Sequence, residues 1–88
     1  MEAYPVAGVS WERFAEVLEP YMSRLTGGIS RQTELEAAGL DSLSLVELVV
    51  VIETEWDVEL PLDALNWDTF ATAGTLFDAV TGVVARAK

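Results

Sequence analysis

A length of 88 residues and a net charge of −10 limit what this chain can be, as does the absence of histidine and cysteine. The length suits a single domain, and without cysteine neither a disulfide framework nor a thiolate metal site can form. The charge disfavours nucleic acid and anionic membranes as partners and favours proteins with basic surfaces.

The apolar residues are distributed as in a soluble globular protein. They make up 51% of the chain, and their longest uninterrupted run is the five residues 48–52. A membrane-spanning helix would need about 20 such residues. The N-terminal residues carry no basic region typical of a signal peptide. We therefore expect a cytoplasmic protein with a tail at residues 1–9 and one folded domain at 10–88.

The first helix is predicted to begin at Trp11, with Ser10 as its N-cap. Apolar side chains then recur at spacings of three and four residues as far as Leu25, which is typical of an amphipathic helix. Pro20 removes a backbone donor inside this pattern, so a kink or a break is expected there. The Thr26-Gly27-Gly28 cluster is expected to end the element.

A long connection, residues 27–41, is predicted to follow. One turn of helix would fit between residues 34 and 38, and Gly39 suits a left-handed turn before the next helix. The apolar side chains expected to hold the connection against the core are Ile29, Leu35 and Leu40.

The second helix is predicted at about 42–56, with Asp41 or Ser42 as its cap. It should end before Pro61, because the residue that precedes a proline is disfavoured in helical geometry. Residues 62–67 are long enough for one or two further helical turns.

The last helix is predicted to start at Thr72 or Thr75, where Thr75 and Asp78 resemble a capping box. The side chains expected to be buried on it are Leu76, Phe77, Val80, Val83, Val84 and Ala87. No strand-like alternation persists anywhere in the chain. The sequence therefore predicts an all-α fold, a four-helix bundle of three main helices and a short third helix.

The second helix has apolar residues on two sides. At about 100° per residue, one arc forms an ordinary core stripe, which consists of Leu45, Leu48, Val49, Ile52 and Trp56. Leu43, Val46 and Val50 lie on nearly the opposite side, flanked by Glu47 and Glu53. A helix buried all round would explain this, but so small a domain has little material to cover a second face. We therefore predict an exposed apolar patch with an acidic rim, as at a partner-docking site.

Ser42 stands at the predicted start of this helix, where three roles are open to it. A catalytic serine would need a base, yet the chain has no histidine and its single lysine is Lys88. The hydroxyl could instead cap the helix. It could also carry a modification, because a phosphate group there would meet the positive end of the helix dipole. Since the acids are scattered and form no EF-hand pattern, we expect neither enzymatic activity nor a metal site.

The stretch GLDSLSLVEL at 39–48, followed by VIETEWDVELP at 51–61, resembles the phosphopantetheine attachment region of acyl and peptidyl carrier proteins. The D-S-L core is only three residues long, but Gly39, Glu47 and Pro61 stand at the distances expected for the family. The similarity extends over most of the chain. The family fold, a four-helix bundle with a short third helix, agrees with the elements predicted from the residues.

The resemblance implies a role for each matching residue. Ser42 would carry 4′-phosphopantetheine through a phosphodiester, with the cargo held as a thioester on the terminal thiol of the cofactor. Asp41 matches the family's acid beside that serine, where the modifying enzyme and its metal engage. The positions that match the family's recognition helix are Leu43, Val46, Glu47, Val50 and Glu53.

Carriers of the fatty-acid type usually have acids near the positions of Ser44 and Thr54, and this chain does not. The segment LNWDTFAT, residues 65–72, resembles the corresponding part of D-alanyl carriers and of discrete aminoacyl carriers. The resemblance therefore implies a discrete acyl or aminoacyl carrier of a polyketide- or nonribosomal-type pathway.

The resemblance also implies a monomer that works with several enzymes. A phosphopantetheinyl transferase would attach the cofactor, an adenylate-forming ligase or an acyltransferase would load the thiol, and a ketosynthase or another condensing enzyme would accept the cargo. The residues alone leave a second hypothesis open, an unmodified acidic helical adaptor that docks partners through Leu43, Val46 and Val50.

Overall fold

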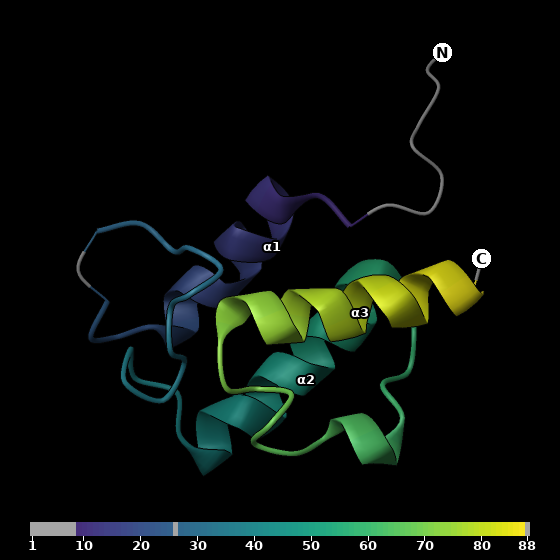
Figure 1. Cartoon of the computed structure of the whole chain (residues 1–88). Coiled ribbons are helices and arrows are strands. Elements are labelled where there is room, and N and C mark those ends of the chain that lie inside the picture. Colours follow the sequence, from purple (N-terminus) through teal and green to yellow (C-terminus); the bar gives the residue numbers. More distant parts are fainter. Residues whose placement is uncertain (1–8, 26, 88) are drawn as a thin grey trace.

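The fold is all-α in a computed structural model of the chain, which describes residues 9–25 and 27–87. Its elements in chain order are the helix α1 (Trp11–Leu18), the 3₁₀ turn η1 (Glu19–Tyr21), α2 (Ser42–Trp56), the 3₁₀ turn η2 (Leu62–Ala64) and α3 (Ala73–Ala87). Within the described ranges the only strand-like feature is an isolated bridge between Glu34 and Thr72. The prediction of three main helices with a short helical element before the last is confirmed (Figure 1).

The first helix is shorter than the apolar spacing predicts. Ser10 caps α1 as expected, because its Oγ accepts a hydrogen bond from Arg13 N at 3.0 Å. The α-helix ends at Leu18, and Pro20 lies in η1, so the break at the proline is confirmed. The predicted continuation of the helix to Leu25 is wrong, although that side chain still packs against the core. Thr26, which was expected to help end the element, lies outside the described residues.

The connection between η1 and α2 is held by buried side chains and, in its described residues, contains no helix longer than one turn. Leu35 and Leu40 are buried and Ile29 is half-buried, as predicted. The single helical turn expected at residues 34–38 is present, because Ala38 N donates to Glu34 O at 3.0 Å, but it does not continue into a helix. Gly39 has a φ of +124°, and a Cβ at this position would lie 2.6 Å from Ser23 Oγ. Close approach and positive φ together explain the glycine here.

The start of α3 differs in detail from the prediction. Thr72 Oγ1 accepts a hydrogen bond from Thr75 N at 3.1 Å, so Thr72 acts as the cap. The predicted capping box between Thr75 and Asp78 is wrong, because Asp78 pairs with Arg31 Nη2 at 2.8 Å. Ala87 is exposed, contrary to expectation, because it belongs to the last turn of the helix.

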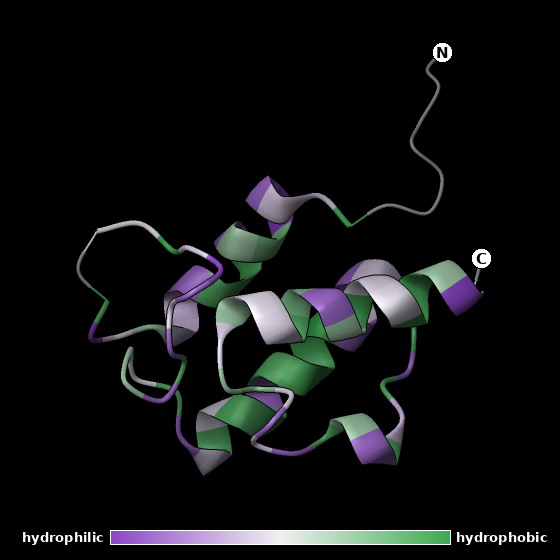
Figure 2. Cartoon of the chain, in the orientation of Figure 1, coloured by the Kyte–Doolittle hydropathy of each residue, from purple (hydrophilic) through white to green (hydrophobic). Residues whose placement is uncertain are grey.

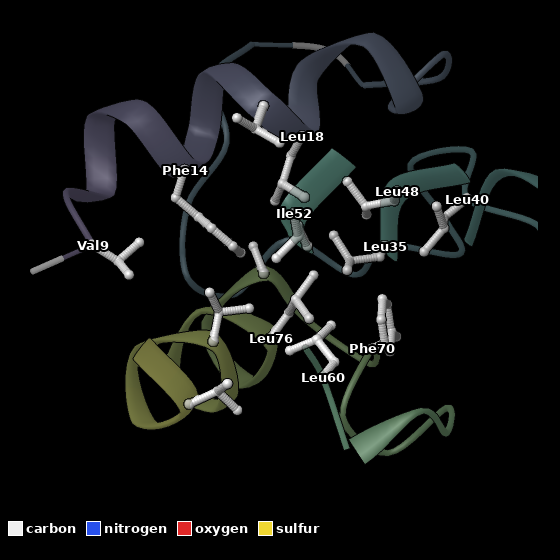
Figure 3. Packing of buried hydrophobic residues seen from close by; sticks show 14 of the residues in the cluster. Val9, Phe14, Leu18, Leu35, Leu40, Leu48, Ile52, Leu60, Phe70 and Leu76 are labelled. Atoms are coloured by element: carbon white, nitrogen blue, oxygen red, sulfur yellow. The ribbon is translucent and has the colours of Figure 1, made fainter. Parts of the chain in front are cut away.

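One hydrophobic core joins all three helices to the loops between them. Phe14 from α1, Ile52 from α2 and Leu76 from α3 are fully buried, and their side chains point toward a common centre (Figure 3). Phe70, from the segment before α3, closes the core on one side and is also fully buried. Val9 is buried as well, whereas the rest of the predicted tail lies outside the described residues.

An ion pair fixes α1 to the C-terminal part of α2. Arg13 Nε and Nη2 donate to the two carboxylate oxygens of Glu55 at 2.7 and 2.8 Å. The guanidinium lowers the pKa of Glu55 below its ordinary value. Arg13, in the first turn of α1, thus lies beside the C-terminal end of α2, whereas Ser42 lies at the opposite, N-terminal end of α2.

No helix in the described part of the chain is long and apolar enough to cross a membrane.

Candidate functional site

Ser42 is the first residue of α2, and its side chain is exposed. Asp41 acts as the helix cap, because its Oδ1 accepts a hydrogen bond from Ser44 N at 2.8 Å. Of the two caps considered from the sequence, the structure therefore assigns Asp41. Across residues 9–25 and 27–87, no group hydrogen-bonds to the Ser42 hydroxyl, which leaves it accessible at the positive end of a 15-residue helix.

The cap also sets the ionisation of Asp41. The hydrogen bond from the Ser44 backbone is the main cause that lowers the pKa of this carboxyl below its ordinary value of 3.8. The carboxylate form is therefore favoured at the start of α2, one residue from Ser42.

Two substitutions of Asp41 should separate capping from charge. We expect Asp41→Ala to lower the thermal midpoint by about 4 to 8 °C, because it removes the acceptor at the helix start. Asp41→Asn should lower the thermal midpoint much less than Asp41→Ala does, since its amide oxygen can still accept the hydrogen bond from Ser44 N. Thermal unfolding followed by circular dichroism measures both, and equal losses in the two variants would contradict the capping role.

The same cap predicts an acid dependence. Because the pKa of Asp41 is lower in the folded chain, its contribution to stability is present above the unfolded value of 3.8 and is lost as the pH falls through the folded value. Asp41→Asn should lack this part of the acid transition.

An open groove of about 260 Å³ lies beside Ser42. One wall comes from α2, through Leu45 and Val46, and the other from the segment after η2, through residues 65–67. Asn66 holds that segment in shape, because its side chain donates to Asp63 O at 2.7 Å and accepts from Thr69 N at 2.8 Å. The groove could not be found from sequence spacing, because its two walls meet only in the folded chain.

The second apolar face of α2 is exposed, as predicted. Leu43, Val46 and Val50 are 71%, 59% and 57% exposed, whereas Leu48 and Ile52 on the opposite side are fully buried. Figure 2 shows the resulting helix as hydrophobic over most of its length. The alternative of a helix buried all round is therefore wrong. We call Leu43, Val46 and Val50 the α2 patch.

The two acids predicted to border the α2 patch differ in their surroundings. Glu47 is exposed. Glu53 is half-buried, and its Oε2 accepts a hydrogen bond from Leu60 N at 2.9 Å. Among the described residues, no group of three or more acids converges as a metal site would require.

Two exposed side chains near the groove were not singled out from the sequence. Leu62, in η2, is 86% exposed, and Trp67, which lines the groove, is 40% exposed. The stretch LDALNW, residues 62–67, has no regular apolar spacing that would reveal which of its members face solvent. Such an exposed leucine and tryptophan are candidates for contact with a partner.

Comparison with known proteins places these features in a family. The family model described as "Phosphopantetheine attachment site" matches residues 12–80, which is most of the chain. An aminoacyl carrier protein of Agrobacterium fabrum (strain C58 / ATCC 33970) is 38% identical over 52 residues, which cover 59% of this chain and 63% of that protein. A D-alanyl carrier protein of Streptococcus sanguinis (strain SK36) is 27% identical over 66 residues, covering 75% of this chain and 84% of that protein.

The match to the Agrobacterium protein thus spans less than two thirds of that relative's length. The family match, by contrast, runs from the first turn of α1 into α3 and includes the whole of α2. The chain therefore belongs to the family of phosphopantetheine carrier proteins, whose members bear a covalently attached 4′-phosphopantetheine and are carriers rather than enzymes.

Proposed function

We propose that this chain is a carrier that holds an acyl or aminoacyl group as a thioester on 4′-phosphopantetheine attached to Ser42. The observation that carries the proposal is the exposed hydroxyl at the start of α2, which is not used for capping. The N–H groups of a helix N-terminus favour a negatively charged phosphodiester at this position.

The surroundings of Ser42 fit such a group. Ser42 is exposed and also lines the groove that Val46 and Trp67 border. When bound, the cofactor supplies the thiol that the chain itself lacks. Asp41 is proposed to engage the modifying enzyme and its metal, since its carboxylate is ionised and lies next to the acceptor serine.

The α2 patch and Glu47 are proposed as the docking surface for partner enzymes. Three apolar side chains with an acidic neighbour provide contact area and a preferred orientation for a partner with a basic surface. The area is small, so docking should be weak and short-lived, which suits a carrier that visits several enzymes in turn. Tethering then raises the effective concentration of the thioester at each partner.

The partners we propose are a phosphopantetheinyl transferase, a loading enzyme and a condensing enzyme. Both relatives are named for aminoacyl groups, which favours an aminoacyl cargo and an adenylate-forming ligase over an acyltransferase. A polyketide- or nonribosomal-type pathway, with a ketosynthase or another condensing enzyme downstream, is the proposed setting.

Intact-protein mass spectrometry tests the attachment. Purified protein incubated with coenzyme A and a broad-specificity transferase should gain the mass of one phosphopantetheine group. Absence of any addition would contradict the proposal and leave the unmodified adaptor, which the exposure of the α2 patch also supports.

Electrostatic steering predicts a charge effect at Glu47. Glu47→Lys should slow phosphopantetheine addition by roughly three- to tenfold at low salt, because it places a positive charge where a basic partner docks. The wild-type rate should also fall with rising salt, since salt screens exposed charges.

Glu12→Lys is the matched control. It changes the net charge by the same amount, but at a position away from Ser42. Glu12 lies in the first turn of α1, next to Arg13, which pairs with Glu55 near the C-terminal end of α2. Its rate should stay within about twofold of the wild type. Equal slowing by the two variants would show that only the net charge of the chain matters.

A further inference from the structure

Glu53 has a role in the fold that its charge alone does not suggest. It lies near the C-terminal end of α2, and its Oε2 accepts a hydrogen bond from Leu60 N at 2.9 Å. Its backbone carbonyl accepts hydrogen bonds from Asp57 N and from Val58 N, the latter at 3.1 Å. One residue thus accepts hydrogen bonds from three of the backbone amides that follow the helix.

Those amides belong to the segment in which the chain reverses direction. Asp57 has a φ of +54°, the left-handed conformation that ends α2. Val58 and Leu60 are buried, so the segment is pressed against the core on one side. Unpaired amides in such a half-buried turn would be costly, and the Glu53 carboxylate satisfies the one nearest to Pro61.

The segment 57–60 determines where the next surface element starts. Pro61 has no N–H and leads directly into η2, which exposes Leu62. Leu65 N then donates to Leu62 O at 3.0 Å, and Leu65 begins the wall of the groove opposite Val46. The placement of that wall is therefore linked to the hydrogen bond at Leu60.

We propose that Glu53 is a positioning residue, which holds the segment 57–60 and thereby places η2 and the outer wall of the groove beside Ser42. This proposal rests on the proposed function, because it concerns the surface that a phosphopantetheinyl transferase would meet. It assigns Glu53 a hydrogen-bonding role, in contrast to Glu47, whose exposed carboxylate is available for steering.

Glu53→Gln and Glu53→Ala distinguish a hydrogen-bond acceptor from a free charge. Glutamine has the same length and keeps an oxygen that can accept the Leu60 N–H, but it has no charge. Alanine removes both. If Glu53 acts by positioning, Glu53→Gln should keep a KM close to that of the wild type and Glu53→Ala should not. If Glu53 acts by steering, both variants should raise the KM of the transferase alike.

Two measurements on each variant provide the test. The first is the hydrogen-exchange rate of the Leu60 amide, followed by NMR, and the second is the KM of a transferase for the protein. Glu53→Ala should speed exchange at Leu60 by roughly tenfold or more, through loss of a hydrogen bond to a charged group, and should raise KM. Glu53→Gln should keep the amide protected and leave KM within about twofold of the wild type.

Val17→Ala is the control for general destabilisation. Val17 is buried in α1, so its truncation weakens the core without removing any of the hydrogen bonds that Glu53 accepts. Its KM should match the wild type. The proposal is overturned if glutamine fails to rescue, if Leu60 stays protected in Glu53→Ala, or if Val17→Ala raises KM equally. Failure of the wild-type chain to accept phosphopantetheine would instead overturn the proposed function, and the Leu60 exchange rates would still test the hydrogen bond.

Discussion

Replacing Ser42 with alanine is expected to abolish phosphopantetheine addition while leaving the thermal midpoint nearly unchanged. The substitution removes the only hydroxyl at the start of α2 that is exposed and has no hydrogen-bond partner among the described residues. Because Asp41 provides the cap, the helix loses no capping interaction. Alanine is also a favourable helix residue, so circular dichroism should show the same helix content as the wild type.

Ser44→Ala is the matched control for this experiment. Ser44 lies two residues further along α2, and its backbone N–H, which the substitution preserves, makes the capping hydrogen bond. This variant should still gain one phosphopantetheine mass in the presence of a transferase and coenzyme A. Addition to Ser42→Ala, or its loss from Ser44→Ala, would contradict the assignment of Ser42 as the attachment site.

The second large effect concerns the two faces of α2. Leu48→Ala should lower the free energy of unfolding by about 2 to 5 kcal/mol, because Leu48 is fully buried and its truncation leaves a cavity. Such a loss is a large fraction of the roughly 5 to 15 kcal/mol typical of a domain. Leu43→Ala makes the same chemical change on the same helix, but at a position that is 71% exposed. It should change stability by no more than about 0.5 kcal/mol.

The rate of phosphopantetheine addition should show the reverse order, with Leu43→Ala affected more than Leu48→Ala. Leu43→Ala is expected to slow phosphopantetheine addition, since it removes an apolar contact from the α2 patch, and the effect should appear at a temperature where both variants are folded. Urea unfolding gives the stabilities, and initial rates of mass addition give the docking effect. A Leu43→Ala variant as unstable as Leu48→Ala would show that the patch is buried in solution.

The three main helices and the two faces of α2 can be predicted from local patterns of residues. The bounds 42–56 follow from local signals, namely a capping acid, apolar periodicity and a proline beyond the end. Exposure of Val46 and Val50 also followed, because a short chain cannot cover a second apolar stripe. Pro20 correctly indicated the break after α1, whereas the apolar spacing that continues to Leu25 does not correspond to helix beyond Tyr21.

The surroundings of Ser42, by contrast, depend on how distant segments pack in the folded chain. The groove pairs Val46 with Trp67, and the carboxylate of Glu53 meets the amide of Leu60 only because the chain reverses after α2. Helix periodicity places Glu53 on the rim of the α2 patch, but it carries no information on which backbone amide lies within reach. Side-chain periodicity reports the face of one helix, whereas hydrogen bonds and grooves between segments depend on how those segments pack.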